Sequence, residues 1–188
     1  MAPMRTFGYA LGLCLLLAAC GGGGTDTTIT CAFAYWDGTV GTCLPHGWHV
    51  VERSSLDQKG VPRDVLVAFQ SDAPSAGQFP TVTVTREALA QPIASTAYSE
   101  ASVQSVKSLP GYQEVDVRTV TVDDADVSLH IFSAQPRPDE PKSRFYQVSA
   151  AKDSAGYTFT AAVPLSIESA MENQILLILG NATFREKK

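Results

Sequence analysis

Apolar and polar residues alternate over much of the chain beyond residue 44, and this alternation is typical of β-strands. The clearest case is residues 81–85, where valines would point to one face and threonines to the other. Residues 65–69 are apolar throughout, which favours a central strand covered on both faces. Strand patterns are also present at residues 48–51, 112–122, 127–133, 145–151 and 157–163.

Two segments show helical spacing instead. Apolar residues recur three to five positions apart over residues 95–109, at Tyr98, Ala101, Val106 and Leu109, and Pro110-Gly111 is expected to end that helix. The second helix carries Ser169 and Glu172 in the spacing of a capping box. Its apolar stripe consists of Ile167, Met171, Ile175, Ile178 and Ala182, widened by Leu176 and Leu179.

This order of elements predicts an α+β fold. The connections at residues 123–124, 136–141 and 154–156 contain turn-forming residues, so the strands that they join are expected to pair as antiparallel hairpins. An antiparallel sheet with an apolar face has to be covered, and the two helices are available for this. We therefore expect an α/β/α sandwich, with an antiparallel β-sheet of about six to seven strands covered by two main helices.

The start of the chain follows a different pattern. Arg5 precedes an apolar run at residues 9–19, and Cys20 with four glycines comes directly after it. A charged start, an apolar middle of roughly ten residues and small residues before a cleavage point are typical of a secretory signal peptide. The run is shorter than the ~20 apolar residues that span a bilayer.

Leu17-Ala18-Ala19-Cys20 resembles the lipobox of bacterial lipoproteins. The resemblance implies that residues 1–19 are cleaved and that Cys20 becomes the lipidated N-terminus, so that the membrane is the partner of this anchor. Residues 20–30 are then a glycine-rich tether. In that family an aspartate after the cysteine favours the inner membrane; Gly21 stands here, so we expect the outer membrane, facing the periplasm. A buried or disulfide-bonded Cys20 is the alternative.

Residues 31–43 are expected to form a small hairpin. Residues 32–36 are β-prone, and Asp37-Gly38 is a strong turn signal. Cys31 and Cys43 are the two cysteines that remain after loss of residues 1–19 and lipidation of Cys20, and an even pair in an exported chain indicates a disulfide. A metal site or a catalytic thiol is the alternative, but the pair lacks the C-x-x-C spacing.

Three aromatic residues in this hairpin, Phe33, Tyr35 and Trp36, are candidate partner contacts. A small hairpin cannot bury all three rings internally, and aromatic side chains dominate the energetics of many protein interfaces. The alternative is that they pack onto the sheet or against the last helix.

Charge and length narrow the classes of function. The chain has 14 Lys and Arg against 19 Asp and Glu. Arg5 is the one charged side chain in residues 1–19, so cleavage after residue 19 would leave 13 basic against 19 acidic residues and a net charge of −6. Such a chain offers no electrostatic footprint for nucleic acid. Its length fits one domain after the hairpin, at residues 44–188.

Candidate chemistry is sparse. His46 and His49 could contribute to a zinc site, which needs three or four protein ligands; the alternative is one turn histidine and one strand-surface histidine. His130 should face away from both of its neighbours and is a candidate general base or a structural residue. Weak cation ligands, or a solvated hairpin tip, are expected at Asp123, Asp124 and Asp126, which lack the glycine and distal glutamate of a calcium loop.

The sequence contains no nucleophile elbow, zinc-protease motif or phosphate-binding glycine loop. We therefore assign no catalytic residue and no cofactor, and we do not expect an enzyme. A hydrolase or metal-dependent enzyme that uses His130 or the pair His46 and His49 is the alternative.

Several segments together resemble the PsbP/DcrB-like domain: residues 44–48 with their strand, the alternating strand near residue 83, the helix ending in Pro110-Gly111-Tyr112, the central hairpins, residues 157–159 and a final helix that ends at Phe184. The resemblance covers about residues 44 to 186 and implies an α/β/α sandwich with a non-catalytic role. Relatives include thylakoid-lumen assembly factors and bacterial envelope lipoproteins, which share no catalytic residues. The hairpin of residues 31–43 lies outside it.

Together these features predict a non-catalytic, membrane-anchored envelope lipoprotein that binds another envelope protein. A carrier of a small lipophilic ligand, held between helix and sheet, is a further alternative.

Overall fold

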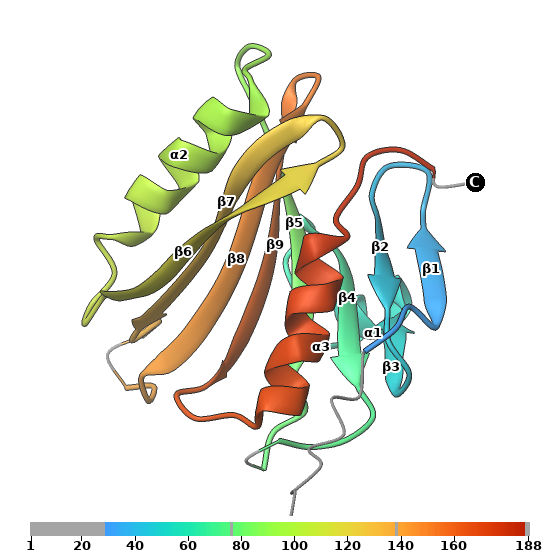
Figure 1. The fold of residues 1–188 in the computed structure, drawn as a ribbon, viewed down its shortest axis with the longest axis vertical. Coiled ribbons are helices and arrows are strands. Elements are labelled where there is room, and N and C mark those ends of the chain that lie inside the picture. The colour runs from blue at the N-terminus through green and yellow to red at the C-terminus, as the bar shows by residue number, and fades with distance from the viewer. Residues whose placement is uncertain (1–28, 76, 138, 187–188) are drawn as a thin grey trace, which may run out of the picture.

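A computed structural model describes residues 29–75, 77–137 and 139–186. The predicted signal peptide, Cys20 and most of the tether lie outside these residues. The described chain forms a seven-stranded sheet with strand order β3-β4-β5-β9-β8-β7-β6 (Figure 1). Its strands are β3 (Trp48–Val51), β4 (Val65–Ser71), β5 (Thr81–Ala88), β6 (Gln113–Val122), β7 (Ala125–Ala134), β8 (Ser143–Lys152) and β9 (Ala155–Pro164).

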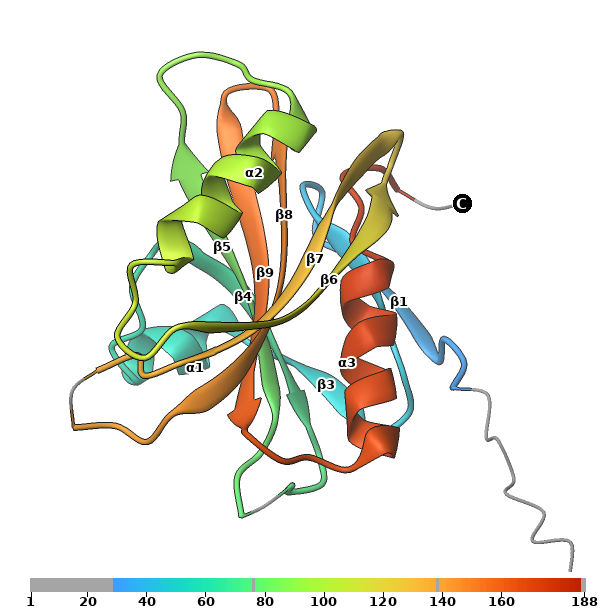
Figure 2. The ribbon, with the colours of Figure 1, turned by 60° about the vertical axis from the view of Figure 1, so that its left-hand side comes forward.

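All neighbouring strands of this sheet are antiparallel. The remaining elements are β1 (Phe33–Trp36), β2 (Gly41–Leu44), α1 (Arg53–Gln58), α2 (Ser95–Val106) and α3 (Ser169–Gly180). Figure 2 shows α2 on one side of the twisted sheet and α3 on the other, with the β1–β2 hairpin next to α3. The predicted α+β sandwich with two main helices is confirmed. Strand β4 is second from the edge, not central as expected.

The main core lies between the sheet and α3. Met171, Ile175, Ile178 and Leu179 of α3 are buried, as the apolar stripe predicted. Tyr146 of β8 is fully buried among them and donates its hydroxyl hydrogen bond to Glu172 Oε1 at 2.9 Å. The strand predicted at residues 81–85 alternates as expected, since both of its valines are fully buried on the core side.

The predicted capping box of α3 is wrong. Glu168, not Ser169, is the N-cap residue, and it makes no side-chain cap. Glu172 turns its carboxylate toward Tyr146 instead, because a buried phenol hydroxyl needs an acceptor. Both α2 and α3 have 12 residues, and none of the described helices is long and apolar enough to cross a membrane.

Helix α2 sits on the sheet through hydroxyl groups. The sequence predicted an apolar face, but Ala101 is exposed and Val106 is half-buried, whereas Tyr98 and Ser99 are buried. Ser102 Oγ lies 2.8 Å from Ser149 Oγ. The polar face of β8 and β9 explains how the helix is seated. On this face, Ser149 of β8 and Thr158 of β9 carry hydroxyl groups that hydrogen-bond to side chains of α2.

Candidate functional site

The β1–β2 hairpin forms as the sequence predicted. Asp37 Oδ1 accepts hydrogen bonds from the backbone N–H groups of Thr39 and Val40, both at 2.8 Å. Gly38 has a φ of +93°, a conformation that favours glycine. The Asp37-Gly38 pair therefore stabilises the turn through local contacts.

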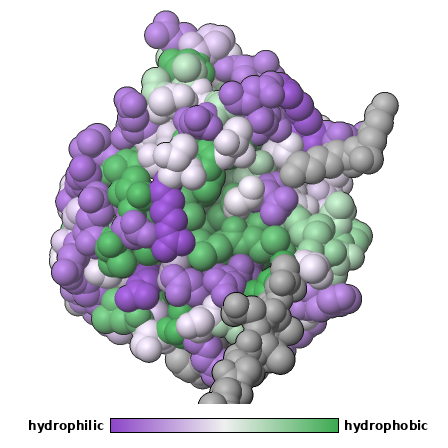
Figure 3. Space-filling view, viewed as in Figure 1, coloured by the Kyte–Doolittle hydropathy of each residue, from purple (hydrophilic) through white to green (hydrophobic). Residues whose placement is uncertain are grey.

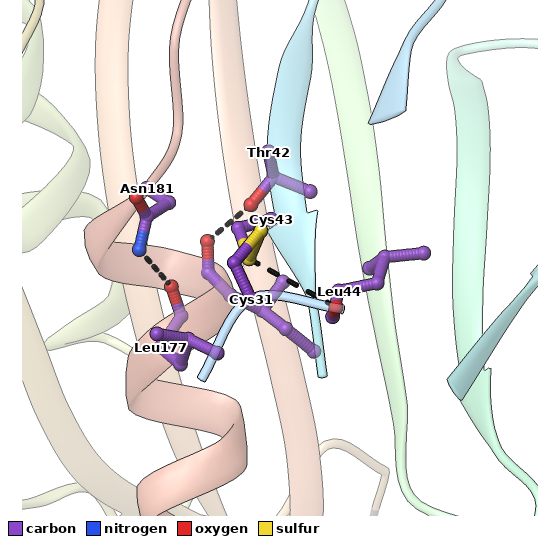
Figure 4. The surroundings of a disulfide bond; sticks show 7 residues. Cys31, Thr42, Cys43, Leu44, Leu177 and Asn181 are labelled. Carbon is purple, nitrogen blue, oxygen red and sulfur yellow. Dashed lines mark hydrogen bonds between the residues drawn. A yellow bond between two sulfur atoms is a disulfide. The ribbon is translucent and has the colours of Figure 1, made fainter. Parts of the chain in front are cut away.

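A disulfide closes the hairpin, and two sets of hydrogen bonds attach it to the end of the chain. A disulfide joins Cys31 and Cys43, with 5.5 Å between their Cα atoms, which confirms the predicted pair. Figure 4 shows it beside α3, where Thr42 Oγ1 donates to the backbone oxygen of Ile178 at 2.5 Å. Gly41 and Thr183 exchange two backbone hydrogen bonds of 2.8 and 3.0 Å. The hairpin is thus held rigidly against α3 and the segment that follows it.

The three predicted contact residues have different surroundings. Tyr35 packs its ring edge-on against the core residue Phe69, with 5.0 Å between the ring centroids. Trp36 is half-buried over Gly41, where a Cβ would lie 2.9 Å from the indole ring. Phe33 is 56% exposed. Packing onto the main sheet therefore accounts for Tyr35 and packing within the hairpin for Trp36, and Phe33 remains available for contact.

A groove with a volume of about 610 Å³ runs beside β1, and this size is within the usual range for ligand-binding pockets. One wall is residues 33–37; the other comes from β3, β4 and the start of α1. Its lining includes the apolar side chains of Val50, Leu66 and Val67, and the charged side chains of Glu52, Arg53 and Glu186. Figure 3 shows that apolar side chains gather on the face that carries α3 and the hairpin.

The groove has an acidic character. Burial, followed by the negative charges of Asp37 and Glu52, raises the pKa of Tyr35 to about 12. Arg53 also lines the groove, but its guanidinium is engaged: Nε donates to Asp57 Oδ1 at 3.0 Å and Nη1 to the backbone oxygen of Val65 at 2.5 Å. The groove therefore combines aromatic and aliphatic walls with carboxylates at its rim.

The acidic turn between β6 and β7 makes structural contacts. Asp123 Oδ1 accepts a hydrogen bond of 2.6 Å from Thr183 Oγ1, and its Oδ2 accepts one of 3.2 Å from the backbone N–H of Phe184. Asp124 forms an ion pair with Arg185. Asp126 accepts a hydrogen bond from Thr121 within the hairpin. The three carboxylates thus serve different partners, and the described residues contain no group of three or more metal-ligating side chains.

Replacing Asp123 with alanine is expected to lower the free energy of unfolding by about 2 kcal/mol, because it removes charge-assisted hydrogen bonds that hold the segment after α3. Urea denaturation measures this loss. Asp124→Ala is the control, since its exposed ion pair with Arg185 contributes little. Equal stability of the two variants would contradict the structural role of Asp123.

His46 and His49 lie at the surface near the start of the main sheet. His46 is exposed in the turn before β3. His49 is exposed on β3 and its Nδ1 lies 2.5 Å from Asp72 Oδ1, whereas Trp48 points inward and donates from Nε1 to Gln174 Oε1 at 2.6 Å. The predicted opposite orientation of Trp48 and His49 is confirmed.

His130 is the buried histidine, with 1% of its surface exposed. Its neighbours Leu129 and Ile131 belong to the core under α3, so His130 faces the opposite side of the sheet, as predicted. Its ring stacks on Phe132 with 4.7 Å between centroids, and Nε2 lies 3.1 Å from the hydroxyl of Tyr112. Nδ1 has no partner among the described residues. A ring this enclosed is not within reach of a substrate.

Acidification below about pH 6.5 is expected to lower the free energy of unfolding through His130. Burial lowers its pKa, the nearby Glu114 raises it and Lys107 lowers it further, with a net decrease. A histidine whose pKa is lower in the folded state binds more protons when unfolded, so stability falls as the pH drops below the unfolded value.

Urea denaturation at intervals between pH 7.5 and 5 tests this. His130→Phe should flatten the pH dependence, because phenylalanine retains an aromatic ring beside Phe132 but does not titrate. His46→Gln, at an exposed position, should leave it unchanged. An unaltered slope in His130→Phe would show that other groups cause the acid response.

A second groove, of about 450 Å³, lies between α2 and the sheet. Hydroxyl-bearing and charged side chains dominate its lining, which includes Asp64, Thr85, Arg86, Glu87, Ser102, Ser105, Thr158 and Thr160. Lipophilic ligands favour mostly apolar pockets. The lining therefore does not favour a lipophilic ligand between α2 and the sheet.

No family model and no curated protein matches the sequence. Among solved structures, the chain is similar to cyanobacterial PsbP from Synechocystis sp. PCC 6803, with a TM-score of 0.52 and 12% identity over 90% of this chain and 99% of that one. It is also similar to LpqN, involved in cell envelope biogenesis of Mycobacterium tuberculosis, with a TM-score of 0.50 and 16% identity over 77% of this chain and 82% of that one. The chain therefore has a PsbP-like fold.

Proposed function

We propose that this chain is an exported bacterial lipoprotein, anchored through acyl chains on Cys20 in the outer membrane and facing the periplasm. Its domain binds another envelope protein through the hairpin of residues 31–43, with Phe33 as the main contact, and has no catalytic role. The lipobox-like residues 17–20 support the anchor. The PsbP-like fold and the similarity to LpqN, which is involved in cell envelope biogenesis of Mycobacterium tuberculosis, are compatible with this setting.

One observation carries the binding role. The hairpin is fixed by the Cys31–Cys43 disulfide and by the bonds of Gly41 and Thr42 to the C-terminal part of the chain, yet it exposes 56% of Phe33. An aromatic side chain on a rigid support loses little conformational freedom on binding, which is how interface hot spots are commonly built. A disulfide at this position also agrees with an oxidising compartment outside the cytoplasm.

The other two functions receive no such support. A general base must lie within hydrogen-bond reach of its substrate, and His130 is enclosed by Tyr112 and Phe132. His46 and His49 are surface residues, and His49 contacts Asp72. The space between α3 and the sheet is filled by core side chains, and the groove beside α2 is polar.

The anchor is tested by cell fractionation and mass analysis of the mature N-terminus. The wild type is expected in the outer-membrane fraction with an acylated Cys20, and Cys20→Ser should lose both the acyl chains and the membrane attachment. A Cys20→Ser protein that is still cut after Ala19 and still fractionates with the membrane would refute the lipid anchor.

The binding role is tested by photo-crosslinking in intact cells. A photoreactive aromatic residue at position 33 should crosslink to one defined envelope protein, and Phe33→Ala should reduce co-purification of that protein. Phe79, which is 53% exposed in a loop, provides the matched control position. The same set of crosslinks from positions 33 and 79 would argue against a contact surface on the hairpin.

A further inference from the structure

We propose that the groove beside β1 binds an extended segment of a protein partner, in which basic and apolar residues alternate and whose backbone pairs with the free edge of β1. This inference rests on the proposed function and adds the chemistry of the partner. The groove is the one lined by residues 33–37 together with β3, β4 and the start of α1.

The groove follows the edge of β1. Successive side chains of a strand point to opposite faces, so a pocket under one face would be lined by alternate residues. Here every residue from Phe33 to Asp37 lines the groove, which places it along the strand edge. Among the described residues β1 pairs with β2 alone. An unpaired strand edge offers backbone donors and acceptors to an incoming strand.

The opposite wall supplies apolar contacts. Val50 and Leu66 are half-buried at the border of the core, and both line the groove. Val50 and Leu66, with the exposed ring of Phe33 on the β1 wall, form an apolar surface in the groove. We call it the apolar floor; it can accept the side chains from one face of an added strand. An extended segment meets this shape better than a helix, because it can use the strand edge and the floor at once.

The charges at the rim select a basic segment. Asp37 and Glu52 lie close enough to Tyr35 to raise its pKa, and Glu52 makes no side-chain cap to α1. The positive charge of Arg53 is balanced by its ion pair with Asp57, so the groups around the groove retain a net negative charge from Asp37 and Glu52. Glu186 also lines the groove.

The same charges disfavour two other occupants. In a symmetric pair of β1 strands, the carboxylates of Asp37 and Glu52 of one copy would approach those of the other, and like charges at an interface are unfavourable. Anionic lipid headgroups would be repelled in the same way. A basic strand from a different protein is the occupant that fits both the walls and the rim.

Isothermal titration of the purified, full mature protein in neutral detergent tests the inference with three synthetic peptides. The first is acetyl-(Val-Lys)₃-amide, the second replaces lysine with glutamate, and the third carries an N-methyl group on every residue of the first. We expect binding of the Val-Lys peptide, at least tenfold weaker binding of the Val-Glu peptide, and loss of binding on N-methylation because that blocks strand pairing.

Two pairs of variants separate the contribution of the apolar walls to peptide binding from that of the charged rim. Glu52→Gln removes one exposed charge pair, so it is expected to weaken Val-Lys binding about two- to fivefold at low salt. Its control is Glu100→Gln, on the exposed side of α2, which should leave Val-Lys binding unchanged. Phe33→Ala is expected to weaken binding about tenfold or more, and Phe79→Ala should not. Thermal unfolding of each variant checks that its fold is intact.

The outcomes distinguish this inference from the proposed function. Equal binding of the Val-Lys and Val-Glu peptides, unaltered binding after N-methylation, or no binding of any peptide at 1 mM, on the order of the weakest specific affinities, would each overturn the basic-strand inference. Crosslinks from position 33 to an envelope protein could persist in those cases, and the proposed function would stand. Peptide binding without such crosslinks would leave the groove chemistry intact and refute the proposed role.

Discussion

Gly156→Ala is expected to lower the free energy of unfolding by about 2–3 kcal/mol, although it adds a single methyl group. A Cβ on Gly156 would lie 2.3 Å from Cε2 and Cζ of the Tyr98 ring. Neither side can move freely. Gly156 pairs with Glu87 and Ala151 across two neighbouring strands, and Tyr98 is a residue of α2 whose side chain is buried against the sheet. The added methyl group therefore has to displace α2 from the sheet.

Urea denaturation with two controls tests this expectation. Gly180→Ala adds the same methyl group at the end of α3, where nothing lies within 4 Å of the new Cβ, so it should be close to neutral or slightly stabilising. In a Tyr98→Ala background, Gly156→Ala should lower the free energy of unfolding much less than in the wild type, because the aromatic ring that would clash with the new methyl group is absent. A loss no larger for Gly156→Ala than for Gly180→Ala would contradict the close packing of α2.

The strands and the long helices could be predicted because their signals are local. The valine–threonine alternation of β5 lies within five residues of sequence, and the apolar stripe of α3, Ile167 to Ala182, within 16. The short helix α1 could not be predicted, because Leu56 is its one buried residue and a single apolar position has no period. The seating of α2 was also missed, since hydroxyl contacts such as Ser102 to Ser149 leave no hydrophobic pattern.

Longer-range contacts explain the failed details. Glu172 has the spacing of a capping-box residue, but Tyr146, 26 residues earlier, takes its carboxylate. No local pattern records that competition. His130 shows the same limit, because strand alternation predicted which face it occupies but not that the hydroxyl of Tyr112 would lie within hydrogen-bond distance of its Nε2.

The candidate site could be predicted in part. The hairpin, its turn and its disulfide follow from adjacent residues and from the inferred compartment of the protein. The second wall of the groove could not be foreseen, because Val50 and Leu66 meet the hairpin only through the pairing of β3 with β4 and the packing of Tyr35 on Phe69. Glu52 was missed for the same reason, and its charge changes the kind of partner that the groove favours.

Removal of the disulfide by the double change Cys31→Ala and Cys43→Ala is expected to lower the free energy of unfolding by about 3 kcal/mol. A cross-link that closes a loop of about 13 residues restricts the unfolded chain to roughly that extent. The protein should still fold, because the bridge between Gly41 and Thr183 and the Thr42 bond to Ile178 hold β2 against the C-terminal part of the chain independently of the sulfur atoms.

Urea denaturation with and without a reductant measures the effect. The wild type should lose about as much stability in reductant as the double variant loses without it, and the double variant should not respond to the reductant. Thr42→Val provides the control: it removes one bond to Ile178, so it should lower stability but keep the full response to reductant. If the reductant did not change the stability of the wild type, and the double variant were as stable as the wild type, the backbone and hydroxyl contacts alone would fix the hairpin. The rigidity that favours Phe33 as a binding residue would then come from those contacts.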